Sequence, residues 1–448
     1  MDVRSPRPHG RIGQKLMVVG GLTATIALVA SCSSPAASTA QHDATGPITL
    51  QTWGDVKSIQ TMFASYQAAN KSTTQGTSLN VLSGGANDTD SIAKFRLELS
   101  AGKDIPDIME LNYSELAEFA DSGVLGDLTG EIGPYLGNVT KAAQALTKYN
   151  RKSIAVPIQV NEKLWFYRSD LFAKAGIDPT KITTQADFIT AGKQLQKVAP
   201  ASYVWNIGPN PQQYQWGMIV SGNGASYSTK SPTCAITVGT DKGVAEAFHA
   251  MKDLRSSGVV ASRIDDSTPQ WQSGLADGTI ASTLGASWLP TFLEQYAPDL
   301  KGKWAVANWP QIGGAIGGSE AGGAIFVITN ASRHKTAAAN FLTKTLMTAS
   351  GASAYMKDNP SYIPNVTSLL EDPAVQNNPY FGQSLIKTYL DASNSYKIFP
   401  YDPAANKETT VLSAQLANYL SSSADSPASY LKTAQDQLTA QVGCPFTN

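Results

Sequence analysis

Six tryptophans of this chain stand beside residues that favour loops, such as glycine, asparagine, proline and serine. A tryptophan held in a loop offers a flat apolar face at low entropic cost, and this face suits the C–H face of a sugar ring. Amides and carboxylates beside it can hydrogen-bond the hydroxyls of the same ring. The six are Trp53, Trp205, Trp216, Trp271, Trp288 and Trp309. We expect Trp165 and Trp304, which lie in strand-like stretches, to belong to the core, because tryptophan is on average a highly buried residue.

Motifs that carry catalysis, metal binding or phosphate binding are absent from the sequence. It contains no HExxH, no paired-cysteine metal spacing, no GxxxxGK loop and no GxSxG elbow. The glycine-rich stretch 313–323 does not follow the dinucleotide pattern of strand, loop and helix. We therefore expect no metal, no cofactor and no catalytic residue. Two carboxylates could still meet in three dimensions, so a secreted carbohydrate-active enzyme stays open as an alternative.

The N-terminal residues predict export from the cytoplasm. Four basic residues precede an apolar run at 16–30, which Ser31 and Cys32 follow. This arrangement is typical of a secretory signal, and the run is short for a membrane span. The stretch LVASC at 28–32 resembles the lipobox of bacterial lipoproteins. That resemblance implies a signal peptide over 1–31 and a lipid (palmitate included) on Cys32; an ordinary secretory peptide is the alternative.

Residues 32–46 predict a flexible tether, because they are almost all small or polar and cannot bury enough apolar surface to fold. The body that follows is long enough for two domains. Residues 1–31 carry a net charge of +3, so removing them changes the formal charge of the chain from −1 to −4. This mild acidity argues against a nucleic-acid partner, which requires basic patches. We expect the body to lie outside the cytoplasm, held at the outer face of the cell membrane through Cys32.

Two cysteines remain once Cys32 is lipidated, namely Cys234 and Cys444. In an oxidising compartment such a pair favours a disulfide. Two separate buried thiols are the alternative.

Strand-like and helix-like stretches alternate along the body. Residues 48–53 and 164–167 predict strands, whereas the apolar spacing over 59–66, 92–99, 244–254 and 341–346 predicts helices. Thr184, three residues before Asp187, predicts a capped helix start. This alternation favours α/β layers with mixed, mostly parallel sheets.

The order of short motifs resembles the family 1 extracellular solute-binding proteins of ABC importers, the maltose-binding-protein group. The matching stretches are DIPDI at 104–108, SGVLGDLT at 122–129, AVP at 155–157 with LWFYRSDLF at 164–172, DGTIA at 277–281 with GASW at 285–288, and GG at 322–323 with AAANFL at 337–342. Arg168-Ser169 replaces the usual Asn-Lys, and Thr279 stands where Lys is usual. The stretches cover nearly the whole exported chain.

The resemblance implies an α/β, two-lobed periplasmic-binding-protein-like fold of type II, with a cleft and a hinge of several strands. It places lobe 1 at 47–128 plus 309–364 and lobe 2 at 129–308 plus 365–448. The ligand would lie in the cleft, and the lobes would close about the hinge.

The resemblance also implies ligand-binding positions, which we carry over residue by residue. Trp288 matches the stacking tryptophan of the maltose-binding protein, Asp55 its acidic residue after the first strand, and Asn161 the position of its ligand-binding glutamate. We expect the other ligand-binding residues to be Asn87, Asn112, Tyr113, Trp271, Glu320, Gly322 and Tyr362.

The function implied is a lipid-anchored receptor that is not an enzyme. It would capture a mono- or oligosaccharide and deliver it to the membrane permease of an ABC importer, with no cofactor and as a monomer. The same fold binding a glycerophosphodiester or another polyol derivative is the nearest alternative.

Overall fold

The computed structural model describes residues 44–54, 56–85, 87–230, 234–315, 320–358, 362–376, 378–395 and 397–445, with only the backbone at 320–322, 358 and 374. The predicted signal peptide, Cys32 and most of the predicted tether lie outside these residues. Residues 41–448 form one compact unit.

The strands of the main sheet are β1 (Pro47–Thr52), β2 (Ser78–Ser83), β3 (Ile108–Asn112), β6 (Ala155–Arg168), β11 (Ser282–Ala286), β12 (Trp304–Asn308) and β13 (Glu320–Ile328). The short strands are β4 (Lys148–Tyr149), β5 (Lys152–Ser153), β7 (Trp205–Asn206), β8 (Ser228–Thr229), β9 (Ala235–Ile236) and β10 (Val260–Ala261). The α-helices are α1 (Val56–Ala69), α2 (Asp88–Ala101), α3 (Leu116–Asp121), α4 (Thr129–Ile132), α5 (Lys141–Leu146), α6 (Ser169–Lys174), α7 (Gln185–Val198), α8 (Gln213–Gly222), α9 (Lys242–Ser256), α10 (Pro269–Asp277), α11 (Leu289–Tyr296), α12 (Lys335–Leu346), α13 (Ala349–Asp358), α14 (Thr367–Leu370), α15 (Pro373–Gln376), α16 (Ile386–Asn394), α17 (Ala405–Ser421) and α18 (Ala428–Gln441). The 3-10 turns are η1 (Tyr113–Glu115), η2 (Gly133–Asn138), η3 (Pro179–Lys181), η4 (Pro298–Leu300) and η5 (Ile312–Gly314).

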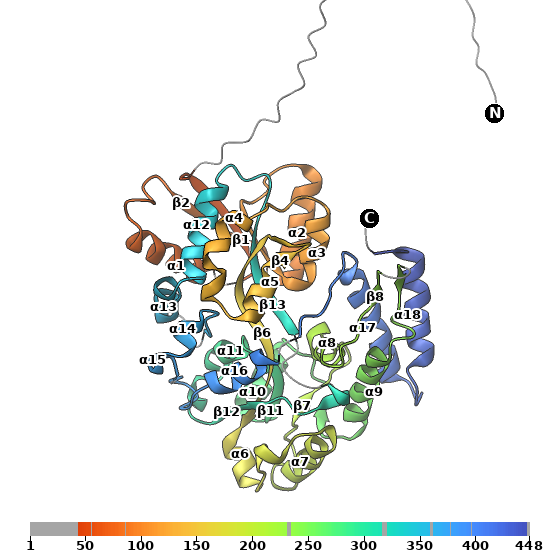
Figure 1. The fold of residues 1–448 in the computed structure, drawn as a ribbon. Helices are drawn as coiled ribbons and strands as arrows, with labels where there is room; N and C mark the ends of the chain where they lie inside the picture. Colours follow the sequence, from red (N-terminus) through yellow and green to blue (C-terminus); the bar gives the residue numbers. More distant parts are fainter. Residues whose placement is uncertain are drawn as a thin grey trace, which may run out of the picture. The chain divides into compact units, whose positions relative to one another are not determined.

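One long strand, β6, holds the body together. Its first half pairs with β13, and its second half pairs with β11 on one edge and β12 on the other. The sheet runs in the order β11-β6-β13-β3-β1-β2. Figure 1 shows β6 and β13 passing through the middle of the body. The hinge expected between two lobes is therefore built on strands that belong to one continuous sheet.

The main sheet is mixed, as expected, but the expectation that it is mostly parallel is wrong. Among its described strands, β1 pairs in parallel with β2 and β3, whereas the pairings of β13 with β3 and of β6 with β11, β12 and β13 are antiparallel. The alternation of strands and helices correctly predicts the parallel β1–β3 part. It could not predict that the remaining strands return antiparallel.

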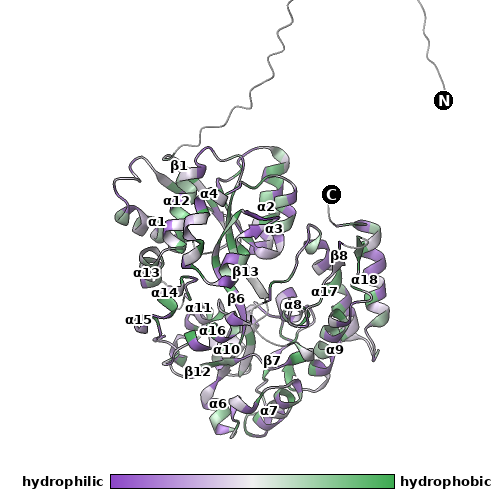
Figure 2. Cartoon of the chain, in the orientation of Figure 1, coloured by the Kyte–Doolittle hydropathy of each residue, from purple (hydrophilic) through white to green (hydrophobic). Residues whose placement is uncertain are grey.

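Three hydrophobic clusters define two lobes, and the buried strands and inner helix faces are the hydrophobic parts of the ribbon (Figure 2). We call lobe 1 the elements around the cluster that contains Ile48, Ile108 and Phe341. We call lobe 2 the elements around the other two clusters, which cover opposite faces of β6 because its side chains alternate: Trp165 belongs to one, and Leu164 and Phe166 to the other. As expected, Trp165 and Trp304 are core residues.

The lobe boundaries remain a proposal, and the clusters suggest a change in one of them. Residues between Ile132 and Val160 pack into the cluster of lobe 1, although the expected boundary at 128/129 assigns them to lobe 2. We propose that the first crossing lies near Glu162 and Lys163, where β6 stops pairing with β13 and starts pairing with β11.

Local sequence signals explain several helix ends. The Thr184 hydroxyl accepts the Asp187 amide at 3.2 Å, and the Thr184 amide donates to the Asp187 carboxylate at 3.0 Å, so α7 begins with the predicted capping box. Helix α2 ends at Gly102, whose φ of 61° lies in the left-handed region that glycine tolerates.

Cys234 and Cys444 form a disulfide with a Cα–Cα distance of 5.4 Å, which is the pairing favoured from the sequence. It joins the segment before β9 to the segment after α18, both in lobe 2. Within the described part of the chain, no helix combines the length and the apolar character needed to cross a membrane.

Candidate functional site

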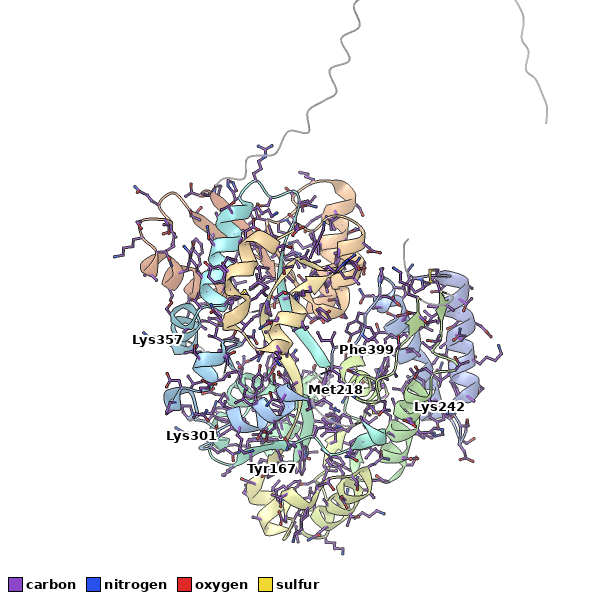
Figure 3. The ribbon with its side chains drawn as sticks, viewed as in Figure 1. Tyr167, Met218, Lys242, Lys301, Lys357 and Phe399 are labelled. Carbon is purple, nitrogen blue, oxygen red and sulfur yellow. A yellow bond between two sulfur atoms is a disulfide. The ribbon has the colours of Figure 1, made fainter. Side chains whose placement is uncertain are left out.

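A group of aromatic side chains of lobe 2 packs against Met218 and Ala286. Trp288, at the start of α11, is partly exposed, and its ring lies nearly perpendicular to those of Tyr214 and Phe292, with centroids 5.6 and 5.5 Å away. Trp309 is also partly exposed and packs with Trp288 and Tyr214 against buried Met218. Figure 3 labels Met218 near the centre of the body, beside β13. Since its neighbours meet it edge-on, the Trp288 ring is held in place, as a stacking platform must be.

Asn161 lies beside this aromatic group on β6. The Ser287 hydroxyl donates to the Val160 carbonyl at 2.5 Å and lies 3.3 Å from Asn161 Oδ1. Ser287, which directly precedes Trp288, is fully buried. One hydroxyl thus couples the position of the Asn161 amide to the start of α11.

Lys163 lies two residues further along the same face of β6, and sequence reasoning missed it. Its side chain is 1% exposed, its Nζ lies 5.0 Å from the centroid of the Trp309 ring, and Nζ has no hydrogen-bond partner among the described residues. Burial, with a smaller effect from Lys397, lowers the pKa of Lys163 to about 7. A buried donor of this kind can serve an acceptor oxygen of a ligand. A lysine within a strand carries no sequence signal for this role.

Lobe 1 has two buried carboxyl groups, Glu110 on β3 and Glu115 on the turn η1 that follows it. The Thr52 hydroxyl accepts the Gly54 amide at 2.8 Å and donates a short hydrogen bond to Glu110. Burial raises the pKa of Glu110 to about 7. Burial, and then the charge of Asp88, raises the pKa of Glu115 to about 8. The protonated form of each carboxyl group can donate a hydrogen bond, and the ionised form can only accept hydrogen bonds.

Two predicted residues of lobe 1 have structural partners. Asn87 is exposed and caps α2 by accepting the Asp90 amide at 2.9 Å. Asn112 donates from Nδ2 to Asp88 at 2.8 Å and is partly exposed. Both residues lie near the carboxyl ends of β2 and β3, where the resemblance places ligand contacts. Each side chain also makes a hydrogen bond within lobe 1 that stabilises the fold.

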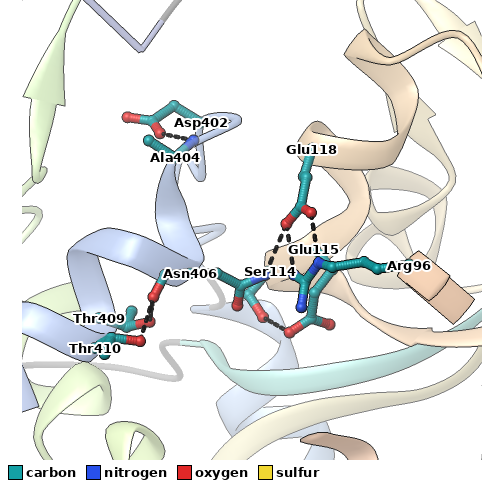
Figure 4. A network of polar contacts seen from close by, with 9 residues as sticks. All are labelled: Arg96, Ser114, Glu115, Glu118, Asp402, Ala404, Asn406, Thr409 and Thr410. Carbon is teal, nitrogen blue, oxygen red and sulfur yellow. Dashed lines mark hydrogen bonds and ion pairs between the residues drawn. The ribbon is translucent and has the colours of Figure 1, made fainter. Parts of the chain in front are cut away.

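The two lobes touch where η1 and α3 face the start of α17 (Figure 4). Asn406 Nδ2 donates to Glu118 Oε2 at 2.9 Å, and Arg96 holds the same carboxylate with two bonds of 2.8 Å. Burial alone would raise the pKa of Glu118, but the hydrogen bonds from Arg96 and Asn406 bring it below its usual value. We name this contact, formed by Arg96, Glu118 and Asn406, the lobe clasp.

Tyr113 is the predicted site residue that reaches the other lobe. Its ring centroid lies 6.2 Å from that of Tyr401, at 68°. Tyr401 in turn accepts a hydrogen bond of 3.4 Å from Gln213, the residue before Tyr214. Tyr401 was not predicted, because the segment that carries it, between α16 and α17, matches no family motif.

Trp271 is a correction. It is 2% exposed and lies in the core of lobe 2, because the first turn of α10 faces inward there, so we do not keep it among the ligand residues. Trp205 and Trp216 are likewise fully buried.

Tyr362 is 7% exposed and donates to the Ile158 carbonyl at 2.6 Å, so its hydroxyl stabilises the hinge strand β6.

Two groups of predicted residues have no described side-chain contacts. Asp55 lies outside the described residues. The backbones of Glu320 and Gly322 belong to β13, and the Glu320 side chain lies outside the described part. Within the described residues, no cluster of three or more His, Cys, Asp or Glu side chains could hold a metal ion.

Known proteins are similar to this chain over most of its length. The family model described as bacterial extracellular solute-binding protein matches residues 25–383. An arabinooligosaccharide-binding protein of Halalkalibacterium halodurans is 24% identical over 361 residues, which are 77% of this chain and 79% of that protein.

Two solved structures share the fold with this chain. One is the binding protein of an ABC transporter from B. animalis subsp. lactis in complex with β-1,6-galactobiose, with a TM-score of 0.74, 22% identity and coverage of 88% of this chain and 97% of that one. The other is the GacH receptor of Streptomyces glaucescens, studied with acarbose, with a TM-score of 0.74, 20% identity and coverage of 88% and 98%. The two-lobed architecture and the extent of the family match lead to one conclusion: this chain belongs to the bacterial extracellular solute-binding protein family.

Proposed function

We propose that this protein captures an oligosaccharide between its lobes and delivers it to the permease of an ABC importer. The observation that carries the proposal is the partly exposed ring of Trp288, held edge-on by Tyr214 and Phe292. Asn161 and Lys163 lie beside it on β6 and can serve hydroxyl and ring oxygens. An apolar platform with a few convergent polar groups is the combination that a sugar ring requires.

Several relatives support the ligand class. The relative from Halalkalibacterium halodurans is named for arabino-oligosaccharides, and the two structural neighbours were solved with a galactobiose and with acarbose. We propose arabino-oligosaccharides as the first ligands to test. We also propose that the protein catalyses no reaction.

The proposal includes a place and a partner for the protein. The lipobox-like stretch supports a body anchored outside the cytoplasm through Cys32. In this proposal the protein acts there as a monomer that docks on the permease. Replacing Cys32 with Ala should move the protein from the membrane fraction to the soluble fraction. Unchanged partition between the two fractions would contradict the anchor.

A glycerophosphodiester ligand is the nearest alternative. A phosphate group favours arginine, and in the described residues Arg96 and Arg168 are each held by a carboxylate, Glu118 and Asp170. Close to the aromatic group, Lys163 lies over the Trp309 ring and Lys397 acts on its pKa, and a lysine binds phosphate as a point charge without the bidentate geometry of arginine.

A ligand screen tests the proposal. Residues 41–448 would be melted with arabinotriose, β-1,6-galactobiose, maltotriose and glycerophosphocholine. A ligand present at 100 times its dissociation constant stabilises the folded state by about 2.7 kcal/mol. We expect a saccharide to raise the melting temperature. A shift with glycerophosphocholine alone would favour the alternative, and new reducing ends during incubation would identify an enzyme.

A further inference from the structure

A hollow in lobe 1 lies apart from the candidate site. Its volume is about 230 Å³, and residues of α1, the turn η2 and the junction between α12 and α13 line it. The three helices pack against one another on one side of lobe 1 (Figure 1). Small-molecule sites usually have volumes of about 300 to 1,000 Å³, so this hollow suits a single small group. We call it the α13 hollow.

The start of helix α13 lies at the hollow. The Thr348 hydroxyl accepts the Gly351 amide at 3.2 Å and so caps the helix. A Cβ at Gly351 would lie 2.0 Å from the Lys344 carbonyl, so glycine is needed for the first turn of α13 to lie this close to the end of α12. The first amides of a helix have no acceptor within the helix, and they favour a negatively charged group.

Lys344 supplies a positive charge at the same place. It lies in the last turn of α12, is partly exposed and lines the hollow. Among the described residues it has no ion-pair partner, and the described lining contains no acidic side chain. The charge of Lys344 and the start of α13 therefore both attract an anion.

Tyr66 on α1 gives independent evidence of a ligand. The residue is 7% exposed, and its ring packs against that of Phe341 with the centroids 5.5 Å apart. It lines the hollow, but its hydroxyl has no hydrogen-bond partner in the part of the chain that the structure describes. Buried polar groups in proteins rarely lack a partner. Burial, and then the neighbouring Tyr135, raises the pKa of Tyr66, so the hydroxyl keeps its proton and can donate it to an acceptor.

Further hydroxyl groups of the lining favour phosphate over carboxylate. Ser65 on α1 and Tyr135 on η2 also line the hollow, and their hydroxyls have no partner among the described residues. Donors thus converge from α1, η2 and α12. A carboxylate offers two acceptor oxygens in one plane, whereas a phosphate group offers more oxygens in a tetrahedral arrangement and can serve donors from several directions.

We propose that the α13 hollow binds a phosphate group through Lys344, the Tyr66 hydroxyl and the first amides of α13. The site is separate from the saccharide site, because all of its described lining belongs to lobe 1 and lies away from Trp288. Two sources carry this group: free inorganic phosphate, and the lipid headgroups of the membrane to which Cys32 would anchor the body.

Calorimetric titration of residues 41–448 with inorganic phosphate at constant ionic strength tests the inference. Wild type should show saturable binding. Lys344→Met should weaken it by roughly tenfold or more, and Tyr66→Phe, which keeps the ring, by roughly three- to tenfold. Lys335→Met is the matched control, because this lysine begins the same helix, is also partly exposed and lies outside the lining, so phosphate affinity should not change. Acetate should bind less tightly than phosphate.

Co-sedimentation with vesicles distinguishes the two sources. Residues 41–448 lack Cys32, so the anchor cannot contribute to binding of phosphatidylglycerol–phosphatidylcholine vesicles. Co-sedimentation that is lost with added inorganic phosphate and in Lys344→Met would support a lipid headgroup as the ligand. Phosphate binding without co-sedimentation would support the free anion.

Three results would overturn the phosphate site: no saturable binding by wild type, acetate binding as tight as phosphate binding, or equal affinities of Lys344→Met and Lys335→Met. Melting curves show whether each variant is folded. Saccharide affinity should be unchanged in Lys344→Met, so failure of this inference would leave the proposed function standing, and failure of saccharide binding would leave this inference standing.

Discussion

At the scale of single residues, the proposed recognition depends most on Trp288. Its ring is partly exposed and braced by perpendicular rings, so truncation removes a platform rather than a core side chain. We expect Trp288→Ala to weaken saccharide binding roughly thirtyfold or more, which corresponds to about 2 kcal/mol. The melting temperature of the unliganded protein should fall less than after truncation of a fully buried tryptophan, because the Trp288 ring is partly exposed. Calorimetric titration beside melting curves measures both quantities.

A second tryptophan provides the matched control. Trp271 is fully packed in the core of lobe 2, so Trp271→Phe should lower the melting temperature and leave the affinity unchanged. If Trp288→Ala behaved like Trp271→Phe, Trp288 would be a core residue and the platform would be wrong.

The buried carboxyl group of Glu162 allows a prediction of how the free energy of unfolding depends on pH. It is fully buried on β6, and burial raises its pKa to about 8. Between the ordinary glutamate value of about 4.3 and this value, the folded state keeps a proton that the unfolded state releases. The free energy of unfolding therefore falls as pH rises through this range, by at most about 1.4 kcal/mol per pH unit from this group.

Glu162→Gln removes that dependence because glutamine stays neutral. Lys163 acts in the opposite direction above about pH 7, since its lowered pKa makes the unfolded state the better proton binder. The difference between variant and wild type cancels the contribution of Lys163. Denaturant unfolding at about pH 5 and about pH 8 should show the variant gaining stability relative to wild type as pH rises. A constant difference would contradict the raised pKa.

At the scale of elements, the lobe clasp links η1 and α3 to α17. The Asn406 amide donates to Glu118, so Asn406→Asp would place two carboxylates side by side. We expect this variant to favour separated lobes and to weaken saccharide binding by roughly three- to tenfold, because closure then costs more. X-ray scattering of the unliganded variant should give a larger radius of gyration than wild type.

Asn418→Asp is the control for the clasp, since Asn418 lies on the exposed face of the same helix and the change in charge is the same. If both variants bound and scattered alike, the Asn406–Glu118 bond would have no part in closure.

The elements also show how far the sequence predicts the fold. Signals within a few residues were reliable: the Thr184 capping box and the helical spacing over 92–99 correspond to α7 and α2. The pairing of distant strands could not be predicted reliably, because the antiparallel pairing of β13 with β3 and β6 depends on the whole fold.

The candidate site was predictable to a similar degree. Motif resemblance proposes Trp288 and Asn161 as ligand residues, and the structure places Asn161 against Ser287, the residue before Trp288. It wrongly included Trp271, which is buried. A nearby proline suggests a loop, but it does not show whether the tryptophan faces solvent or the core. It missed Lys163 and Tyr401, whose importance arises only from their contacts with Trp309, Gln213 and Tyr113.

At the scale of the whole molecule, two lobes share one sheet through β6, and the aromatic surface of lobe 2 lies next to that shared strand. A ligand bound there would lie at the pivot, so small rotations about β6 and β13 could bring the carboxyl groups of lobe 1 onto it. The lobe clasp, in which Asn406 of α17 donates to Glu118 of α3, joins the same two lobes. We propose that this arrangement couples the capture of a sugar to lobe closure.

The most direct test of this account is calorimetric titration of residues 41–448 with the saccharide that gives the largest thermal shift, followed by scattering with and without it. We predict saturable binding of one ligand per chain and a smaller radius of gyration in the complex. Absence of heat and of a thermal shift with every saccharide tested would contradict the central claim that this protein is a saccharide receptor.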